Sequence, residues 1–259
     1  MNVPTLAAGL AADVVKSRTS TLPSTDPRSR TPTRRVEIQG LTPDGTLKDI
    51  TGLAPARPIF EDAFSALSHG SLLSTPQGPI AVEDIWPGDL VDTVDHGPLP
   101  LLWKGCMTLN PRQPSQAALT SPLTRLQADS LGISRPSRDL ILGPSARLVY
   151  RSGDLQATIG HDKALISAAE QQDGEQAIGM NPISPVRVFH IAFEKHALVL
   201  VNGVEVESFH PGPQVGQVLY AHGLQLYLSF FPHVTRLRDF GPLSYPRLTS
   251  EELESLRRD

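Results

Sequence analysis

Histidines and serines are the side chains in this sequence best suited to acid–base or nucleophilic chemistry, but no common motif groups them. His190 and His196 are six residues apart, a spacing that puts both on one face of an unbroken strand. They could form a site with two imidazoles, but the residues favour one hydrogen-bonded core histidine followed by a turn histidine. A metal site of His190, His196 and His210 is disfavoured because no carboxylate accompanies the three imidazoles. We therefore expect neither a metal nor a cofactor.

The composition excludes several functional classes. The chain has 259 residues, with 23 Lys and Arg against 27 Asp and Glu, for a formal net charge of −4. This balance, without a basic stripe, argues against a dedicated nucleic-acid binder, and no apolar run approaches the about 20 residues of a membrane span. The single cysteine, Cys106, excludes an internal disulfide framework and a multi-cysteine zinc site. A protein partner is left open.

The sequence also lacks the signatures of several large enzyme classes: a Walker loop, G-x-G-x-x-G, G-x-S-x-G and H-E-x-x-H. Residues 1–15 do not have the basic start and continuous apolar stretch of a secretory signal. Together with the lone cysteine, this favours a cytoplasmic protein. Secretion by a signal-independent route stays open.

Short apolar runs separated by turns dominate the chain from about Phe64 onward. Asn202-Gly203 joins two such runs and is a strong hairpin signal, because both residues tolerate the positive φ of a type I′ turn. The runs are irregularly spaced and do not alternate with long helices. They predict an all-β domain rather than a Rossmann or TIM architecture.

The two ends of the chain predict other structure. Residues 17–35 offer little to bury and predict a disordered segment, and Pro43-Asp44-Gly45 could turn a short hairpin. Residues 215–228 predict one largely buried helix, and Thr249 with Glu252 predicts a capping box for a short terminal helix. We expect three parts: a mostly disordered arm with at most a short hairpin (1–59), a compact β domain (60–212) and a helical C-terminal extension (213–259).

Three blocks of sequence, in this order, resemble the Hint domains, the hedgehog/intein autoprocessing family. The first contains Gly70-Ser71-Leu72-Leu73-Ser74-Thr75 and continues to Trp86-Pro87-Gly88-Asp89. The second is D-L-I-L-G-P-S-A-R at 139–147, where the bacterial branch usually reads D-L-x-L-S-P-x-H-R. The closing blocks are V-F-H-I at 188–191, His196, and N-G-V-E-V-E-S-F-H-P at 202–211. The resemblance covers roughly residues 64–212 and implies a compact all-β fold with self-processing activity, either autoproteolysis or protein splicing.

The resemblance also implies a mechanism whose key groups are replaced here. In Hint domains a first-residue Cys, sometimes Ser, attacks the preceding carbonyl, and a second-block His protonates the departing amide nitrogen. The family pattern C-F-x-x-G-T places Ala66 at the nucleophile, and the second block places Ala146 at the His. The penultimate His and terminal Asn of inteins fall on Glu207 and Ser208. The family-motif residues that remain are Gly70, Gly88, Asp89, His190, His196, Asn202 and Gly203.

Two functional hypotheses follow from these replacements. The first is a catalytically degenerate Hint domain, a pseudoenzyme that acts as a structural or interaction module. The alternative is active autoprocessing by an N–O acyl shift at Ser65 or Ser68 that releases the N-terminal arm. An unactivated serine needs a nearby base, and Ala146 cannot supply one. Cys106 is interpreted as a small buried apolar residue rather than a nucleophile.

The hypotheses predict different structures near Ala66. Autoprocessing predicts a scissile peptide in a strained, partly buried turn, with a hydrogen-bond donor within reach. The module predicts an ordinary trans peptide there and an exposed apolar patch elsewhere.

Overall fold

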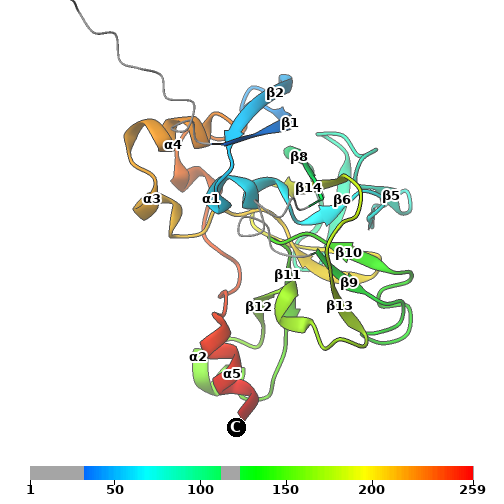
Figure 1. The fold of residues 1–259 in the computed structure, drawn as a ribbon. Helices are drawn as coiled ribbons and strands as arrows, with labels where there is room; N and C mark the ends of the chain where they lie inside the picture. Colours follow the sequence, from blue (N-terminus) through cyan, green and yellow to red (C-terminus); the bar gives the residue numbers. More distant parts are fainter. Residues whose placement is uncertain (1–31, 112–122, 259) are drawn as a thin grey trace, which may run out of the picture. The chain divides into compact units, whose positions relative to one another are not determined.

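The structure is a computed structural model that describes residues 32–111 and 123–258 (Figure 1). Within these residues, two antiparallel sheets carry most of the regular structure, and the helices are short. The predicted all-β class is confirmed. Most of the expected N-terminal disorder falls on residues 1–31, which lie outside the described residues.

Eight strands of the described chain form the first sheet, in the spatial order β13-β9-β10-β3-β14-β8-β1-β2. These strands are β1 (Thr33–Leu41), β2 (Leu47–Pro55), β3 (Leu67–Ser68), β8 (Trp103–Leu109), β9 (Leu123–Leu126), β10 (Leu140–Leu142), β13 (Ala177–Met180) and β14 (Val186–Ala192). The short strand β3 lies between β10 and β14. The segment that follows Ala66 therefore runs through the middle of this sheet.

The second sheet follows the order β12-β11-β16-β15-β4-β5, and β6 pairs with β15 and β7. Its strands are β4 (Leu72–Leu73), β5 (Ile80–Ala81), β6 (Leu90–Thr93), β7 (Gly97–Pro100), β11 (Arg147–Tyr150), β12 (Ala164–Ser167), β15 (Leu198–Val201) and β16 (Val204–Glu207). The β15–β16 hairpin turns at Asn202 and Gly203, which have φ of 50° and 84°. The predicted Asn-Gly hairpin is confirmed.

The helices of the described chain are all short. The α-helices are α1 (Pro58–Glu61), α2 (Leu155–Ile159), α3 (Val215–Val218), α4 (Ala221–Leu228) and α5 (Ser250–Arg258), and the 3₁₀ turns are η2 (Asp62–Phe64), η4 (Ala168–Gln171) and η5 (Leu237–Phe240). None of the described helices is long and apolar enough to cross a bilayer.

The N-terminal hairpin is part of the first sheet rather than a separate arm. β1 pairs with β2 through the turn at Pro43-Asp44-Gly45 and, on its other side, with β8, where Val36 stands opposite Met107. The sequence interpretation of residues 33–35 as disordered is wrong, because they begin β1. Their partners in β2 are distant enough that local composition carries no signal for the pairing.

Aromatic side chains from both ends of the described chain build a core on the first sheet. Phe60 and Phe64 from the N-terminal side pack with Phe230 from the C-terminal side, and Trp103 donates its indole N–H to the Phe230 carbonyl at 2.7 Å. Gly105 makes room for them, since a Cβ there would lie 2.4 Å from Trp103 and 2.6 Å from Phe64. Burying each such ring stabilises the fold by about 2 to 3 kcal/mol.

The predicted single, largely buried helix over residues 215–228 is wrong in two respects: the chain forms α3 and α4 with a break at Leu219 and Tyr220, and only Val215, Leu219 and Tyr227 of this segment are buried. Leu219 has extended backbone angles and is buried, whereas Tyr220 is exposed. At about 100° per residue, the apolar residues 215, 219, 224 and 226–228 would not lie on one face of a single helix. The break lets Leu219 and Tyr227 both pack into the aromatic core.

After η5 the chain crosses to the second sheet, where residues 243–249 lie as an extended strap that leads into α5 (Figure 1). Leu165 of β12 donates its N–H to the Pro246 carbonyl at 2.8 Å and accepts from the Leu248 N–H at 2.9 Å. The predicted capping box is confirmed, because Glu252 accepts from the N–H and hydroxyl of Thr249 at 2.8 and 2.9 Å. Leu256 of α5 packs with Leu155 of α2.

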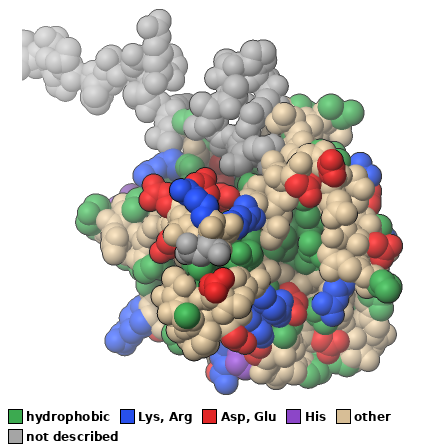
Figure 2. Space-filling model, turned by 90° about the horizontal axis from the view of Figure 1, so that it is seen from below, with side chains coloured by type: hydrophobic (Ala, Val, Ile, Leu, Met, Phe, Trp, Pro, Cys, Tyr) green, Lys and Arg blue, Asp and Glu red, His purple; other side chains and the backbone are tan. Residues whose placement is uncertain are grey.

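The face of the molecule shown in Figure 2 carries basic and acidic side chains next to one another. Ion pairs such as the one between Arg151 and Glu205 occur at the surface of the described chain. This mixed pattern agrees with the sequence, in which neither sign of charge forms a continuous block.

Candidate functional site

Ala66 and Ala146 occupy two adjacent, fully enclosed segments. Ala66 connects η2 to β3, and Ala146 precedes β11; their exposed fractions are 0% and 1%. The Gly143 N–H donates to the Ala66 carbonyl at 2.7 Å, and the Ser145 N–H donates to the Ser65 carbonyl at 3.2 Å. The structure therefore brings together the two positions that the sequence matched to the nucleophile and the acid. It fills both with methyl groups.

Gly143 explains how closely these two segments approach. A Cβ at this position would lie 2.0 Å from the Ser65 carbonyl oxygen and 2.7 Å from its carbon. Any side chain at 143 would therefore collide with backbone that has no room to yield. The family pattern has Ser at this position. The glycine found here lets the two segments pack closely over the Ser65 carbonyl.

Ser65 is buried, and its hydroxyl meets another hydroxyl rather than a base. Ser65 Oγ lies 3.2 Å from Ser145 Oγ, the one side-chain hydrogen bond recorded for it within the described residues. Neither hydroxyl can take up the proton that a serine must lose to attack a carbonyl. Burial and a hydrogen-bond partner thus make Ser65 a satisfied core residue.

The peptide that joins Ser65 to Ala66 is trans, since the described residues have a cis bond only at Arg135-Pro136. The Ser145 N–H lies within hydrogen-bond reach of its carbonyl. A hydrogen-bond donor at the Ser65 carbonyl would stabilise attack by a nucleophile at position 66, because a nucleophile attacks the carbonyl that precedes it. A hydroxyl at 65 would instead attack the Phe64 carbonyl. The donor and the available hydroxyl therefore serve different peptides.

The other candidate hydroxyls have no base either. Ser68 lies in β3, opposite Val188 of β14, and its Oγ donates to the adjacent His69 carbonyl at 3.4 Å. Ser71 Oγ is buried without a hydrogen-bond partner in the described chain. Burial raises the pKa of the Cys106 thiol, which keeps it protonated and agrees with a packing role.

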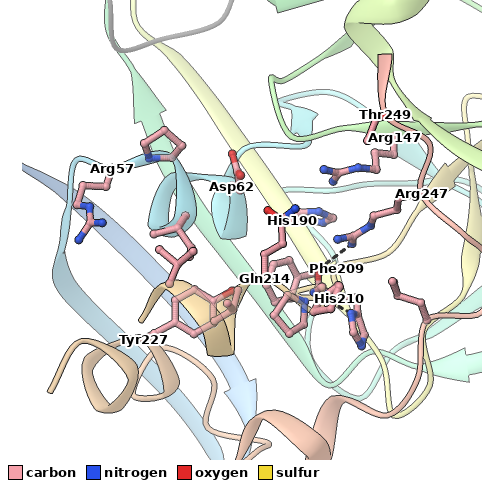
Figure 3. A pocket seen from close by; sticks show the side chains of 18 of the residues that line it. Arg57, Asp62, Arg147, His190, Phe209, His210, Gln214, Tyr227, Arg247 and Thr249 are labelled. Atoms are coloured by element: carbon pink, nitrogen blue, oxygen red, sulfur yellow. Dashed lines mark hydrogen bonds between the residues drawn. The ribbon is translucent and has the colours of Figure 1, made fainter. Parts of the chain in front are cut away.

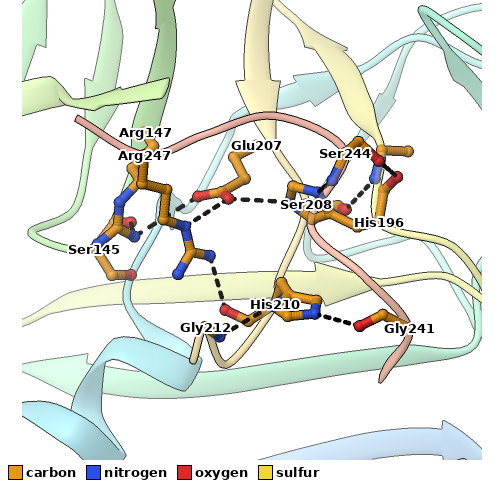
Figure 4. Close-up of polar contacts among 11 residues, drawn as sticks. Ser145, Arg147, His196, Glu207, Ser208, His210, Gly212, Gly241, Ser244 and Arg247 are labelled. Atoms are coloured by element: carbon orange, nitrogen blue, oxygen red, sulfur yellow. Dashed lines mark hydrogen bonds and ion pairs between the residues drawn. The ribbon is translucent and has the colours of Figure 1, made fainter. Parts of the chain in front are cut away.

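The C-terminal positions Glu207 and Ser208 form part of a buried polar cluster (Figure 4). Glu207 accepts from Arg247 Nε at 2.8 Å and from His196 Nε2 at 2.9 Å, and Arg147 Nη1 lies 3.6 Å from it. Burial by itself raises the pKa of Glu207, but the His196 hydrogen bond and the charges of Arg247 and Arg147 outweigh it and lower the pKa to about 2. Glu207 is therefore a buried, paired carboxylate.

His196 joins this cluster to the C-terminal strap. Its Nδ1 accepts from the Ser244 N–H at 2.9 Å, so the proton lies on Nε2 and is donated to Glu207. The Ser244 hydroxyl donates to the His196 carbonyl. Ser208, at 0% exposure, accepts from the Ala197 N–H and donates its own N–H to the Ala197 carbonyl. The strap and the domain end are thus tied to the turn that carries His196.

The three histidines of the disfavoured metal hypothesis have other partners. His190 is fully buried on β14 against the Phe209 ring, and burial lowers its pKa to about 3. His210 accepts from the Gly212 N–H and donates to the Gly241 carbonyl, and burial lowers its pKa to about 4. No group of three His, Cys, Asp or Glu side chains within residues 32–111 and 123–258 is arranged to hold a metal.

The remaining family-motif residues lie in turns. Gly70 and Gly88 have φ of 83° and 103°, which glycine adopts without strain. Asp89 accepts from the Trp86 N–H at 2.8 Å, as a turn-capping carboxylate does. Asn202 Oδ1 accepts from the Leu72 N–H. Trp86 is about half exposed, with Lys104 Nζ 5.7 Å from its ring centre.

A pocket of about 630 Å³ reaches Arg147, the residue that follows Ala146 (Figure 3). It is lined by Asp62 from the N-terminal side, Arg147 and His190 from the domain, and Arg247 from the strap. Part of the Asp62 side chain reaches solvent, but the surrounding protein desolvates its carboxyl and raises its pKa to about 6, against the lowering by the charge of Arg147. The sequence analysis missed Asp62, Arg147 and Arg247 as site residues, because 185 positions separate the first from the last and no motif links them.

Comparisons with known proteins agree with this arrangement of blocks. The family model described as "Hint domain" matches residues 65–213, more than half of the chain. The chain belongs to the Hint domain family. The matched span begins at Ser65 and ends five residues after Ser208. The two junction positions, Ser65–Ala66 and Glu207–Ser208, therefore lie inside this Hint domain.

Similar solved structures include the solution structure of a bacterial intein-like domain from Clostridium thermocellum, at 14% identity and TM-score 0.38, covering 56% of this chain and 99% of that one. The crystal structure of the gp41-1 intein matches at 12% identity and TM-score 0.33, covering 56% and 98%. The MchDnaB-1 intein matches at 14% identity and TM-score 0.34, covering 56% and 100%. The search of curated proteins found no match.

Proposed function

We propose that this Hint domain is catalytically degenerate and acts as a structural or interaction module. The observation that carries the proposal is the burial of Ala66 and Ala146, which the sequence blocks match to the nucleophile and the acid. A general acid is worth about 10² to 10⁴ in rate, and the nucleophile supplies the entire route. Without both groups the route by acyl shift is lost.

The packing of the flanking segments supports a structural role. On the N-terminal side, β1 pairs with β8, and Phe60 and Phe64 are buried in the aromatic core. On the C-terminal side, Phe209 and Phe231 belong to the same core. The flanks that a processing reaction would separate are therefore joined to the domain by shared burial. Cleavage at Ser65 would leave the pieces associated.

Exposed apolar side chains offer contact points for a partner, as an interaction module requires. Trp86 and Leu90 are exposed before and within β6, and Ile133, Ile183 and Tyr220 are exposed on three other segments. Single exposed apolar residues are ordinary on protein surfaces, so they support an interaction role only weakly. The structural role is the better supported of the two.

Autoprocessing at Ser65 or Ser68 is the second candidate. The Ser145 N–H beside the Ser65 carbonyl favours it, because a preorganised donor at a carbonyl stabilises the charge that develops on attack. Against it, the attacking group that this donor would assist is Ala66. Each serine hydroxyl also meets only neutral oxygen partners in the described chain.

Intact mass under denaturing conditions distinguishes the two candidates. The full chain, tagged at both ends, is incubated with and without hydroxylamine, which cleaves esters and thioesters. A single species at full mass is expected. Fragments that break between Phe64 and Ser71 would overturn the proposal. Denaturing conditions are necessary because native fragments would stay packed together.

A gain-of-function variant tests whether Ala66 and Ala146 are the correct positions. In A66C/A146H the introduced thiol can attack the Ser65 carbonyl, so that the acyl group moves from the amide nitrogen to sulfur and the nitrogen takes a proton from the introduced imidazole. Hydroxylamine should then release an N-terminal fragment that ends at Ser65. The matched single variant A66C lacks the acid and should yield at least tenfold less fragment. Equal yields from both variants would contradict the assignment of Ala146.

A further inference from the structure

The pocket beside the buried alanines is formed jointly by the Hint domain and its flanks (Figure 3). Its wall includes Pro58 and Ile59 before the domain, His190 and residues 209–213 within it, and residues 214–215 and 247–249 after it. Its volume of about 630 Å³ falls within the roughly 300–1,000 Å³ of small-molecule sites. None of the roles described above uses this space.

Positive charge exceeds negative charge around the pocket. Arg147 and Arg247 both line it, and the one carboxylate that pairs with them, Glu207, lies behind the wall. Arg247 donates from Nε to Glu207 and from Nη2 to the His210 carbonyl, and within the described chain Nη1 has no recorded hydrogen bond. Arg147 lies 3.6 Å from Glu207 and keeps about a third of its side chain exposed. Two guanidinium groups thus share one buried carboxylate.

The rest of the pocket wall carries apolar side chains and one carboxylate, and these limit the chemical class of ligand that fits. Ile59, Val215 and Tyr227 provide apolar surface, so an apolar body can be buried there. Asp62 contributes a carboxylate on the same wall and opposes a second negative charge on the ligand. Arg57 is exposed and adds a third cation to the lining. The pattern fits a monoanion with an apolar body better than a phosphate dianion.

We propose that this pocket binds a small organic monocarboxylate, with its carboxylate between Arg147 and Arg247 and its apolar part against Ile59, Val215 and Tyr227. Guanidinium groups bind carboxylates through paired N–H donors and remain charged in partly buried sites. The inference does not rest on the loss of self-processing, because the pocket exists in the uncleaved chain.

Titration of the full-length protein with 3-phenylpropionate, followed by amide chemical shifts, tests the proposal. A ligand of this size should bind with a dissociation constant in about the millimolar range. The saturable shifts should be centred on Gly212, Val215 and Arg247. The uncharged 3-phenylpropionamide is the matched probe and should bind at least about tenfold more weakly, because it loses the charge-assisted hydrogen bonds.

Two variants of opposite sign locate the carboxylate. Arg147→Gln should weaken binding about tenfold, and Arg151→Gln, which removes an equal charge from a surface ion pair with Glu205, should leave it unchanged. Asp62→Asn should tighten binding about threefold or more, because it removes a negative charge from the wall. Asp62→Asn keeps the test valid if Arg147→Gln disturbs the Glu207 cluster.

Four results would contradict the proposal. The first is no saturable shift at 10 to 20 times the expected millimolar constant. The second is equal affinity for the acid and the amide. The third is an affinity that neither Arg147→Gln nor Asp62→Asn changes. Binding of inorganic phosphate in competition with 3-phenylpropionate at equal affinity would contradict the choice of a monocarboxylate.

Discussion

Two junction positions within the Hint domain, at Ser65–Ala66 and at Glu207–Ser208, are closed by different physical means. At the first, small side chains let two backbone segments approach, and Gly143 leaves no space above the Ser65 carbonyl. At the second, a buried carboxylate is held by His196 and Arg247. One junction is closed by shape and the other by charge. The two junction positions therefore do not share a single kind of packing.

The comparison also shows which junction depends on distant parts of the chain. The contacts at Ser65 involve residues of the domain itself, from the segment 143–146. At Glu207, by contrast, one partner is Arg247 of the C-terminal strap, and Ser244 of the same strap holds a second partner, His196. The first junction should respond to changes of side-chain volume, and the second to changes of charge and pH. Three predictions test this difference.

The largest expected effect comes from adding one methyl group at the first junction. Gly143→Ala would place a Cβ 2.0 Å from the Ser65 carbonyl oxygen, and backbone on both sides would have to move. We expect a loss of roughly 3 to 5 kcal/mol in the free energy of unfolding. Urea denaturation followed by circular dichroism measures this loss.

Gly153→Ala is the matched control for this prediction. Its Cβ would meet nothing within 4 Å, and the backbone is outside the left-handed region. The control should be neutral or stabilise the protein by up to about 1 kcal/mol. If the two variants unfold at the same urea concentration, the closed packing over Ser65 does not exist.

The second prediction removes the carboxylate at the charged junction. Glu207→Ala would leave the guanidinium of Arg247 partly buried without its ion-pair partner. We expect a loss of about 3 kcal/mol, since breaking a buried pair costs roughly 3 to 5 kcal/mol. Limited proteolysis of the strap should become faster, because Arg247 anchors it.

Glu205→Ala provides a control on the same strand. Glu205 pairs with Arg151 at the surface, and such exposed pairs contribute about 0 to 1 kcal/mol. A loss for Glu205→Ala that equals the loss for Glu207→Ala would show that the Glu207 cluster adds nothing beyond an ordinary surface pair.

The third and smallest effect is a loss of stability in acid that arises around the charged junction and the aromatic core. Burial lowers the pKa of His190, His210 and His233 to about 3, 4 and 4 from 6.5. Between these values the unfolded chain binds protons that the folded chain does not, so stability falls as pH falls below 6.5. Glu207, with its pKa lowered from 4.5 to about 2, adds to the loss below pH 4.5.

Asp62 acts in the opposite direction. Its pKa is raised from 3.8 to about 6, so the folded chain takes up this proton first and gains stability as pH falls through that range. Because three histidines oppose one carboxyl, we expect a net loss of about 2 kcal/mol between pH 7.5 and 6, and a further loss toward pH 5. Urea midpoints at pH 7.5, 6 and 5 measure it.

His233→Phe separates the histidine contribution from the rest. Both ring nitrogens of His233 are buried without a hydrogen-bond partner in the described chain, and the ring packs on Phe231 and Phe240. The variant should be more stable at all three pH values, by about 1 kcal/mol or more, and most at pH 5. A variant with the same pH dependence as the original protein would rule out His233 as a source of the acid loss.

The sequence predicted the features that depend on neighbouring residues. The Asn202-Gly203 hairpin and the Thr249 capping box are confirmed because turn and cap geometry is set within a few residues. The single helix over 215–228 is wrong because the burial of Leu219 and Tyr227 in one core overrode the local preference. The inclusion of residues 33–35 in β1 was missed because their pairing partners are far along the chain.

The sequence by itself determined that alanine stands at positions 66 and 146, and the order and spacing of the family blocks predict that these are the positions of the nucleophile and the acid. Only the tertiary structure decided how the two junctions are closed and that Arg247 meets Glu207 across 40 residues. It also decided that Asp62, Arg147 and Arg247 line one pocket. Such contacts depend on sheet order and on the path of the strap, which a linear pattern of residue types does not encode.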